Sequence, residues 1–192
     1  MAEIVPFKKP ANSPGLVHAT CLLLGSRAIL LRGTSGSGKS RLAGTILHAA
    51  KSAGRFACLV ADDQIEIQAV NGRLLIGVPE NIAGLREHAG IGILEEPYER
   101  RAIAGLVVDL IMNDRESRRM PDLATLMTSI ENIHLARLSL QANAPGTAEM
   151  IMEVMVQLEK NLYRPETLST IRVESLLHPR SQLFNDGGCG QV

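Results

Sequence analysis

The sequence predicts a single α/β domain in which one P-loop-type βα unit is embedded in a mixed sheet with hairpins. Three observations predict it: short apolar runs separated by turns, a glycine-rich segment between an apolar run and a helical one, and ordinary globular composition. Hydrophobic residues make up 45% of the chain and charged residues 21%. The length of 192 residues suits one continuous core, and no repeat or low-complexity linker divides it. We therefore expect one domain over residues 1–192, with flexible ends at about 1–13 and 180–192.

The first half of the chain predicts strands around one helix. Residues 16–25 and 27–32 are apolar and predict two buried strands joined by a tight turn at Gly25-Ser26. Residues 40–52 then have apolar side chains at helical spacing. Residues 56–60 predict a short buried strand that ends just before Asp62-Asp63. Residues 64–70 and 73–78 predict a hairpin, because Asn71-Gly72 favours a type I′ turn.

The second half predicts further strands and one longer helix. Residues 81–89 predict a short helix, 91–94 and 102–110 predict strands, and 113–120 form a polar connection. Residues 133–140 predict the last strand, and 149–162 are apolar at helical spacing. This order of strands and helices along the chain favours a mixed sheet.

Charge and cysteine content exclude several classes of protein. Twenty basic and twenty acidic side chains balance, so no overall field favours nucleic acid or an anionic membrane. The three cysteines have no metal-site spacing, and no apolar run is long enough for a signal peptide or a bilayer span. We expect a soluble cytoplasmic protein without nucleic-acid or membrane partners.

The strongest motif is the segment 33–40, which reads GTSGSGKS and matches the P-loop pattern GxxxxGK[ST]. Gly33 and Gly38 permit backbone conformations that turn successive N–H groups toward a phosphate. Lys39 would contact the β- and γ-phosphates, and the Ser40 hydroxyl would bind Mg²⁺. The predicted nucleotide is ATP or GTP with one Mg²⁺. The residues of this predicted cradle are Gly33, Thr34, Ser35, Gly36, Ser37, Gly38, Lys39 and Ser40.

Two positions compete for the acidic residue that such a site needs. Asp109 ends the apolar run LVVD, as a generic Walker B aspartate does, whereas Asp62 and Asp63 follow an earlier strand. Repulsion between adjacent carboxylates favours proton uptake by one of them, which suits a general base. The pair could equally be a solvated turn that opens the hairpin. His18 lies in the middle of the strand expected at 16–25, where a histidine is more often a satisfied core residue.

Several motifs together resemble the catalytic domain of HPr kinase/phosphorylase, a bacterial enzyme that phosphorylates a serine of the phosphocarrier protein HPr. They are His18, the P-loop, the tetrad 60–63 (VADD), and a signature formed by Pro79, Gly84-Leu85, Glu87 and residues 90–93. The resemblance covers about residues 14–125, and by the order of elements the remainder as well, and it implies a PEP carboxykinase-like P-loop core. The combination is far more specific than the P-loop alone.

The resemblance also implies roles for individual residues. The P-loop and Asp62 would bind ATP, and Glu87 would join Ser40 as a ligand of Mg²⁺. Asp63 would accept the proton of the attacking serine, with His18 and Lys39 near the phosphates. Arg119 matches the place of a catalytic arginine, and Asp109 becomes a core strand residue.

Three departures from the family pattern bear on activity. Ala89 replaces the signature arginine, and the later PGRN-type loop is reduced to residues 145–147. The N-terminal domain of the long enzymes is not present, so the chain resembles the short proteobacterial form. These departures leave phosphorylase activity open.

The leading hypothesis is therefore an ATP- and Mg²⁺-dependent protein-serine kinase that acts on HPr or on a nitrogen-type relative. One alternative is a regulatory module that binds nucleotide without catalysis. Another is a small-molecule kinase or generic NTPase, which would place its metal at Asp109. The helix expected at 149–162 and the C-terminal tail could provide contacts between subunits, so a homo-oligomer also stays open.

Overall fold

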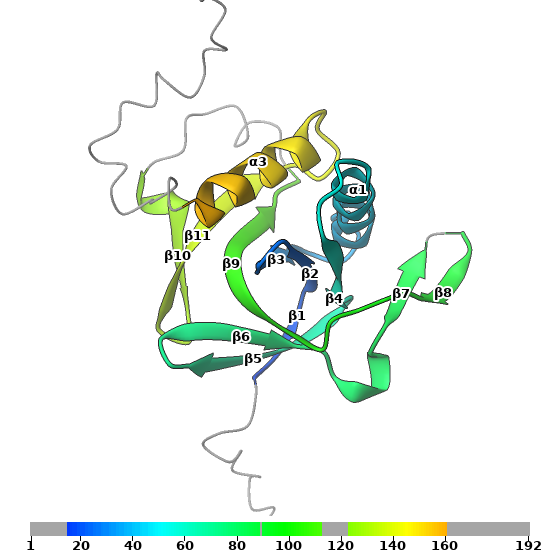
Figure 1. Ribbon diagram of the computed structural model, residues 1–192, viewed down its shortest axis with the longest axis horizontal. Coiled ribbons are helices and arrows are strands. Elements are labelled where there is room, and N and C mark those ends of the chain that lie inside the picture. Colours follow the sequence, from blue (N-terminus) through cyan, green and yellow to red (C-terminus); the bar gives the residue numbers. More distant parts are fainter. Residues whose placement is uncertain (1–14, 89, 113–122, 161–192) are drawn as a thin grey trace, which may run out of the picture.

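The computed structural model describes residues 15–88, 90–112 and 123–160. Predictions for Arg119, Ala89, the connection at 113–120 and the two chain ends lie outside these residues. The elements of the described residues are shown in Figure 1. In chain order they are β1 (Gly15–His18), β2 (Thr20–Leu24), β3 (Arg27–Arg32), α1 (Lys39–Ser52), β4 (Ala57–Ala61), β5 (Gln64–Val70), β6 (Arg73–Gly77), the 3-10 turn η1 (Glu80–Ile82), β7 (Leu85–His88), β8 (Gly92–Glu95), β9 (Arg101–Leu110), the 3-10 turn η2 (Leu123–Leu126), β10 (Met127–Ile130), β11 (Ile133–Leu140) and α3 (Thr147–Glu159).

Most strands belong to one mixed sheet with the order β1-β5-β6-β9-β3-β2-β4. Strands β3 and β11 run parallel to β9, whereas β2 is antiparallel to both of its neighbours, β3 and β4. The long strand β9 pairs with β6 through residues 101–103 and with β11 through residues 106–110. It curves between the two, so the sheet curls (Figure 1). The predicted α/β class with a mixed sheet and hairpins is confirmed.

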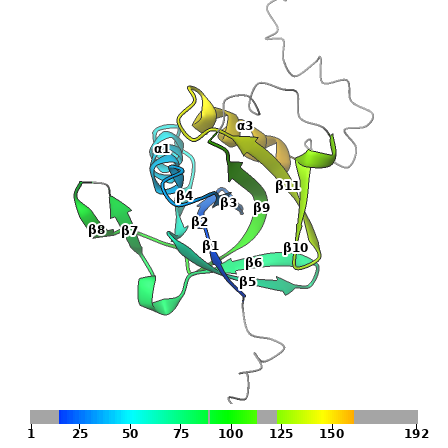
Figure 2. The ribbon, with the colours of Figure 1, turned by 180° about the vertical axis from the view of Figure 1, so that it is seen from behind.

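Two hydrophobic cores lie on opposite faces of this sheet. On one face, helices α1 and α3 pack against β2, β3 and β9, with Leu42 and Ile46 of α1 and Ile151 of α3 fully or almost fully buried. The other face is closed by the curl of the strands themselves, around residues such as Leu30 and Ile76. Figure 2 shows the two helices together on one side of the curled sheet. None of the helices in the described part of the chain is long and apolar enough to cross a membrane.

Some predicted elements differ from the structure. The strand expected at 16–25 is two strands, because the Ala19 N–H bonds to the Asp63 carbonyl at 3.1 Å and the chain changes its pairing partner there. His18 therefore ends β1, opposite Gln64 of β5, and is not in the middle of a strand beside β3. The helix expected at 81–89 is also wrong. Gly84, at φ 73°, separates the 3-10 turn from strand β7.

Candidate functional site

The candidate site lies at one edge of the sheet, where strands β3 and β4 end. Both are antiparallel to β2, so they run in the same direction and their carboxyl ends meet at the same edge. Strand β3 leads into the glycine-rich loop at 33–38, and β4 leads into Asp62-Asp63. Thr20 begins β2 at this same edge. Strand directions therefore bring together groups that are distant in sequence.

Three glycines of the loop have positive φ, and at two of them an added side chain would also crowd its neighbours. Gly33 has φ 156° and Gly38 has φ 93°, as the sequence predicted. A Cβ at Gly33 would lie 2.7 Å from the Ser37 Oγ, and one at Gly38 would lie 3.0 Å from the Ala142 Cβ. Helix α1 begins directly after Gly38 and has no acidic residue in its first turn. The positive end of the helix dipole is thus not neutralised by an acidic residue of the helix itself.

Two side chains, one in the loop and one at the start of α1, have polar groups suited to a phosphate. Lys39 is buried and donates to the carbonyl oxygens of Gly33 and Thr34, both at 3.1 Å. The Ser37 Oγ is buried and has no hydrogen-bond partner among the described residues. A buried hydroxyl of this kind is costly unless a ligand or water supplies a partner. The lysine and this hydroxyl fit a phosphate group.

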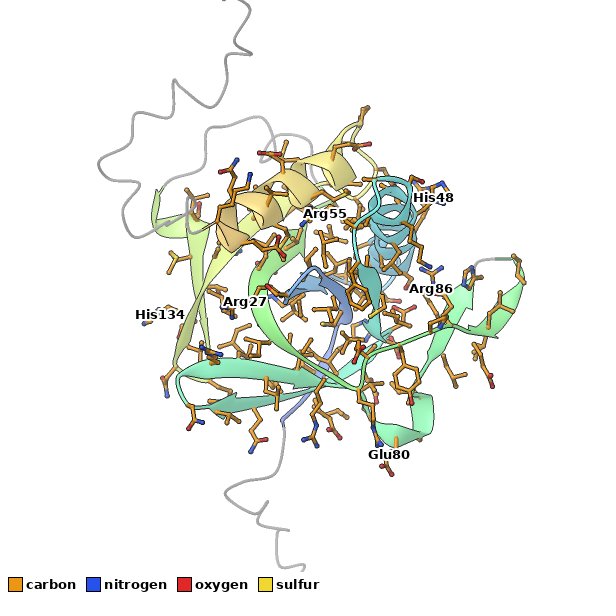
Figure 3. The ribbon with its side chains drawn as sticks, viewed as in Figure 1. Arg27, His48, Arg55, Glu80, Arg86 and His134 are labelled. Carbon is orange, nitrogen blue, oxygen red and sulfur yellow. The ribbon has the colours of Figure 1, made fainter. Side chains whose placement is uncertain are left out.

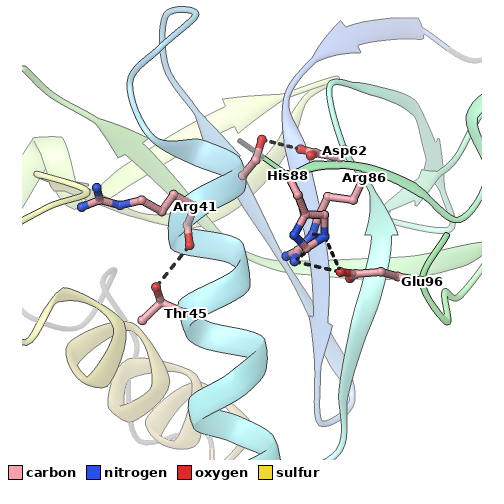
Figure 4. Close-up of polar contacts among 7 residues, drawn as sticks. Arg41, Thr45, Asp62, Arg86, His88 and Glu96 are labelled. Carbon is pink, nitrogen blue, oxygen red and sulfur yellow. Dashed lines mark hydrogen bonds and ion pairs between the residues drawn. The ribbon is translucent and has the colours of Figure 1, made fainter. Parts of the chain in front are cut away.

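Asp62 connects helix α1 to the neighbouring strand β2. Its buried carboxylate accepts, on Oδ1, hydrogen bonds from Thr20 Oγ1 at 2.7 Å and Ser40 Oγ at 3.0 Å. Figure 4 shows Asp62 beside the N-terminal end of α1. Within the described residues, no group of three or more His, Cys, Asp or Glu side chains is arranged to hold a metal ion. One hydroxyl and one carboxylate fit Mg²⁺ that takes its other ligands from phosphates and water.

Asp63 and His18 form a second polar pair at the same edge. The His18 Nδ1 lies 2.9 Å from the Asp63 Oδ1, and the Asp63 side chain is 71% exposed. Asp63 has φ 74°, so the backbone turns sharply between β4 and β5. The aspartate is thus a residue of the turn that opens the hairpin and also an exposed carboxylate in the same cleft as the loop. Its neighbour Asp62 faces inward, so the two carboxylates have different surroundings.

One cleft of about 690 Å³ joins these groups with strand β7. Glu87 lines this cleft with an exposed side chain, but no hydrogen bond or ion pair joins it to Ser40 or Asp62. The lining residues are His18, Thr20, Ser35, Gly36, Gly38, Lys39, Ser40, Arg41, Gly44, Asp62, Asp63, Arg86, Glu87, His88 and Ile91. The cleft therefore contains candidates for phosphate binding, metal binding and proton transfer.

Asp109 has a different environment. Its carboxylate accepts hydrogen bonds from Arg32 at 2.7 and 2.9 Å and from Arg137 at 2.6 Å. Burial alone would raise the pKa of Asp109, but the hydrogen bonds and charges of the two arginines outweigh it and hold the pKa below its usual value. Asp109 is not among the residues that line the cleft. It joins three neighbouring strands, β3, β9 and β11.

Six residues of the cleft were not among the predicted site residues: Thr20, Arg41, Gly44, Arg86, His88 and Ile91. Thr20 could have been found from strand register, because an antiparallel β2 must begin where β3 ends. No local feature of the sequence indicates Arg86 or His88 as site residues. Residues 81–89 predict a short helix, and not the alternating side chains of strand β7. Residues 145–147 lie where α3 begins: Gly146 is the N-cap residue of that helix, and the Thr147 hydroxyl donates to the Gln141 carbonyl at 2.9 Å.

Comparison with known proteins finds a similarity of structure. No protein-family model matches the chain, and no curated protein matches its sequence. A solved structure of the Hpr(Ser) kinase/phosphatase from Coxiella burnetii aligns with 77% of this chain and 91% of its own, at 20% sequence identity and a TM-score of 0.61. The two chains share a fold. At this identity the likeness concerns the mixed α/β architecture and not the activity.

Proposed function

We propose that the protein is an ATP- and Mg²⁺-dependent protein-serine kinase whose acceptor is HPr or a close relative of HPr. The observation that carries the proposal is the single cleft in which a P-loop, the Ser40–Asp62 pair and the exposed Asp63–His18 pair meet. The fold shared with the kinase/phosphatase from Coxiella burnetii supports the same function. The P-loop within a PEP carboxykinase-like core is part of this proposal.

The P-loop residues would hold the triphosphate. Amides of the loop and the N-terminus of α1 donate to phosphate oxygens, and Lys39 exchanges its bonds to the Gly33 and Thr34 carbonyls for phosphate contacts. Ser40 and Asp62 would hold Mg²⁺ together with Glu87 from strand β7. The metal ion, when bound, neutralises charge on the β- and γ-phosphates.

Asp63 would accept the proton in the transfer step. The serine oxygen of the acceptor forms a bond to the γ-phosphorus, the bond from that phosphorus to the bridging oxygen of ADP breaks, and the serine proton passes to the Asp63 carboxylate. His18, at 2.9 Å, orients this carboxylate. Arg119, which lies outside the described residues, would contribute a further positive charge to the transition state.

A phosphoacceptor assay tests the proposal. The full chain is incubated with γ-labelled ATP, Mg²⁺ and purified HPr, and the proteins are separated and hydrolysed for phosphoamino-acid analysis. The expected result is label on a serine of HPr that depends on both Mg²⁺ and the enzyme. Asp63→Asn should abolish most of this label while ATP binding continues.

Other outcomes would replace the proposal. ATP retained without any label on HPr would identify a nucleotide-binding module without catalysis. Steady release of phosphate in the absence of a protein acceptor would identify an NTPase or a small-molecule kinase.

A further inference from the structure

The β7–β8 hairpin stands apart from the main sheet, and Arg86 is the buried residue that attaches it. Strands β7 and β8 form a separate two-stranded sheet, and every residue of β8 is exposed. Both ribbon views show the hairpin projecting beside α1 (Figures 1 and 2). Arg86 is the one buried residue in these two strands, and it extends between β7 and α1 (Figure 3).

The guanidinium of Arg86 is confined on three sides. Its Nη2 lies 2.8 Å from the Glu96 Oε1, and its Nε lies 3.3 Å from the His88 Nε2. On the third side it lies against Gly44 of helix α1, where an added Cβ would be 3.0 Å from Nη1 and 3.6 Å from Cζ. Figure 4 shows Arg86, His88 and Glu96 gathered beside this helix. Glycine is unfavourable inside a helix, and here it provides the space that the arginine occupies.

The hydrogen bonds around the Arg86 guanidinium are incomplete, so the contact is not an efficient way to stabilise the fold. Within the part of the chain that the structure describes, the buried Arg86 Nη1 has no hydrogen-bond partner. The single His88 Nε2 lies 3.1 Å from the Arg86 Nη2 and 2.9 Å from the Glu96 Oε1, and it cannot accept from the first and donate to the second at the same time. An apolar side chain in place of a buried ion pair is often neutral or stabilising. Stability alone therefore does not explain why an arginine stands here.

We propose that Arg86 is a positioning residue that fixes the hairpin against helix α1 and thereby sets Glu87 at the cleft that would hold Mg²⁺ with ATP; this rests on the proposed function. Successive residues of a strand point to opposite faces, so anchoring Arg86 on α1 also orients the next side chain. Glu87, Arg86 and Ser40 line the same cleft. Partners that orient a metal ligand typically change metal affinity by about 10–100-fold when they are removed.

The first test measures Mg²⁺ dependence without catalysis. A fluorescent ATP analogue is titrated onto the full chain in EDTA and then at increasing Mg²⁺. In Arg86→Met the Mg²⁺ concentration for half-maximal tightening should rise about tenfold, whereas binding in EDTA should change much less. Arg86→Lys should not restore the wild-type value, because lysine keeps the charge but lacks the planar fork. Arg100→Met, which removes an exposed arginine paired with Glu80, is the control and should match the wild type.

The second test uses Gly44 and reads stability. Gly44→Ala should displace the guanidinium, lower the melting temperature and shift the Mg²⁺ dependence as Arg86→Met does. With Arg86→Ala already present, the same change should raise the melting temperature by about 2–4 °C, because the space is then vacant and alanine favours the helix. An equal effect of Gly44→Ala in both backgrounds would show that the arginine does not occupy this space, and would overturn the proposal.

The two proposals fail in different ways. If the wild type binds the analogue with Mg²⁺ and Arg86→Met has the wild-type Mg²⁺ dependence, the role of Arg86 is wrong and the proposed function stands. If the wild type does not bind the analogue at all, both are wrong. If Arg86→Met does not fold, Gly44→Ala answers the same question through its Mg²⁺ dependence, and an unchanged value would refute the role of Arg86.

Discussion

The hydroxyl of Ser40 lies 3.0 Å from the carboxylate of Asp62, although 22 positions separate the two residues in the chain. The contact joins the first turn of α1 to the end of β4, across the intervening strand β2. Thr20, at the start of β2, donates to the same Asp62 oxygen at 2.7 Å. The carboxylate is thus fixed by two hydroxyls before any ligand arrives, and such preorganisation reduces the cost of binding a metal ion.

Removing the Thr20 hydroxyl should loosen the proposed metal site. Thr20→Val keeps the shape of the side chain but leaves the Asp62 Oδ1 with Ser40 as its remaining donor. We expect the Mg²⁺ requirement for binding of an ATP analogue to rise about tenfold. Thr45→Val is the control, since that hydroxyl bonds to the Arg41 carbonyl on the exposed side of α1. Equal Mg²⁺ requirements in the two variants would contradict the role of Thr20.

Neutralising Asp63 should separate chemistry from binding. Asp63→Asn removes the proposed proton acceptor, and asparagine tolerates the positive φ of this position, so the turn should be kept. We expect phosphotransfer to HPr to fall by about 10²–10⁴-fold, while the affinity for ATP changes little. Glu131→Gln, in another turn with positive φ, should transfer at the wild-type rate. Transfer by Asp63→Asn at that same rate would assign the base to another group.

Local signals in the sequence were reliable. The P-loop pattern predicted where α1 begins, and Gly33 and Gly38 have the positive φ values that the pattern requires. The hairpin at 64–78 was predicted from Asn71-Gly72, and both residues have positive φ, 48° and 72°. In these cases the backbone conformation is dictated by the residues themselves.

Features that depend on distant partners could not be predicted in the same way. The split between β1 and β2 occurs because the Ala19 N–H bonds to Asp63, on a segment some 40 residues later. Residues 81–89 have the apolar spacing of a short helix, but β7 pairs instead with β8. The burial of Arg86 depends on Gly44 and Glu96, so its sequence neighbours indicate only an exposed charge.

Replacing Lys39 should weaken nucleotide binding with little effect on the fold. Its ammonium group contacts only the loop carbonyls of Gly33 and Thr34 among the described residues. Lys39→Met should therefore lower the affinity for ATP at least about tenfold, measured by fluorescence titration, because the β- and γ-phosphates lose their positive partner. Lys51→Met, in the last turn of the same helix, is the control. Similar losses in both variants would indicate a general charge effect.

Asp109 should stabilise the sheet rather than bind nucleotide. Asp109→Asn keeps the shape of the side chain but removes the charge that Arg32 and Arg137 share. We expect the free energy of unfolding at about pH 7 to fall by roughly 2–3 kcal/mol, since hydrogen bonds to charged groups are lost. Affinity for ATP with Mg²⁺ should match the wild type, as Asp109 does not line the cleft. Glu80→Gln, which alters an exposed pair, should change stability by less than about 0.5 kcal/mol.

The stability difference between the wild type and Asp109→Asn should depend on pH. The arginines hold the pKa of Asp109 in the folded protein below its unfolded value of about 3.9, so the carboxylate contributes its stability above that value. The contribution disappears as the pH falls through the folded pKa. Urea unfolding of the wild type and Asp109→Asn, compared from about pH 7 downward, should therefore give curves that differ most near neutrality and converge in acid. A difference that grows on acidification would mean that the folded protein favours the protonated aspartate, contrary to its position between two guanidinium groups.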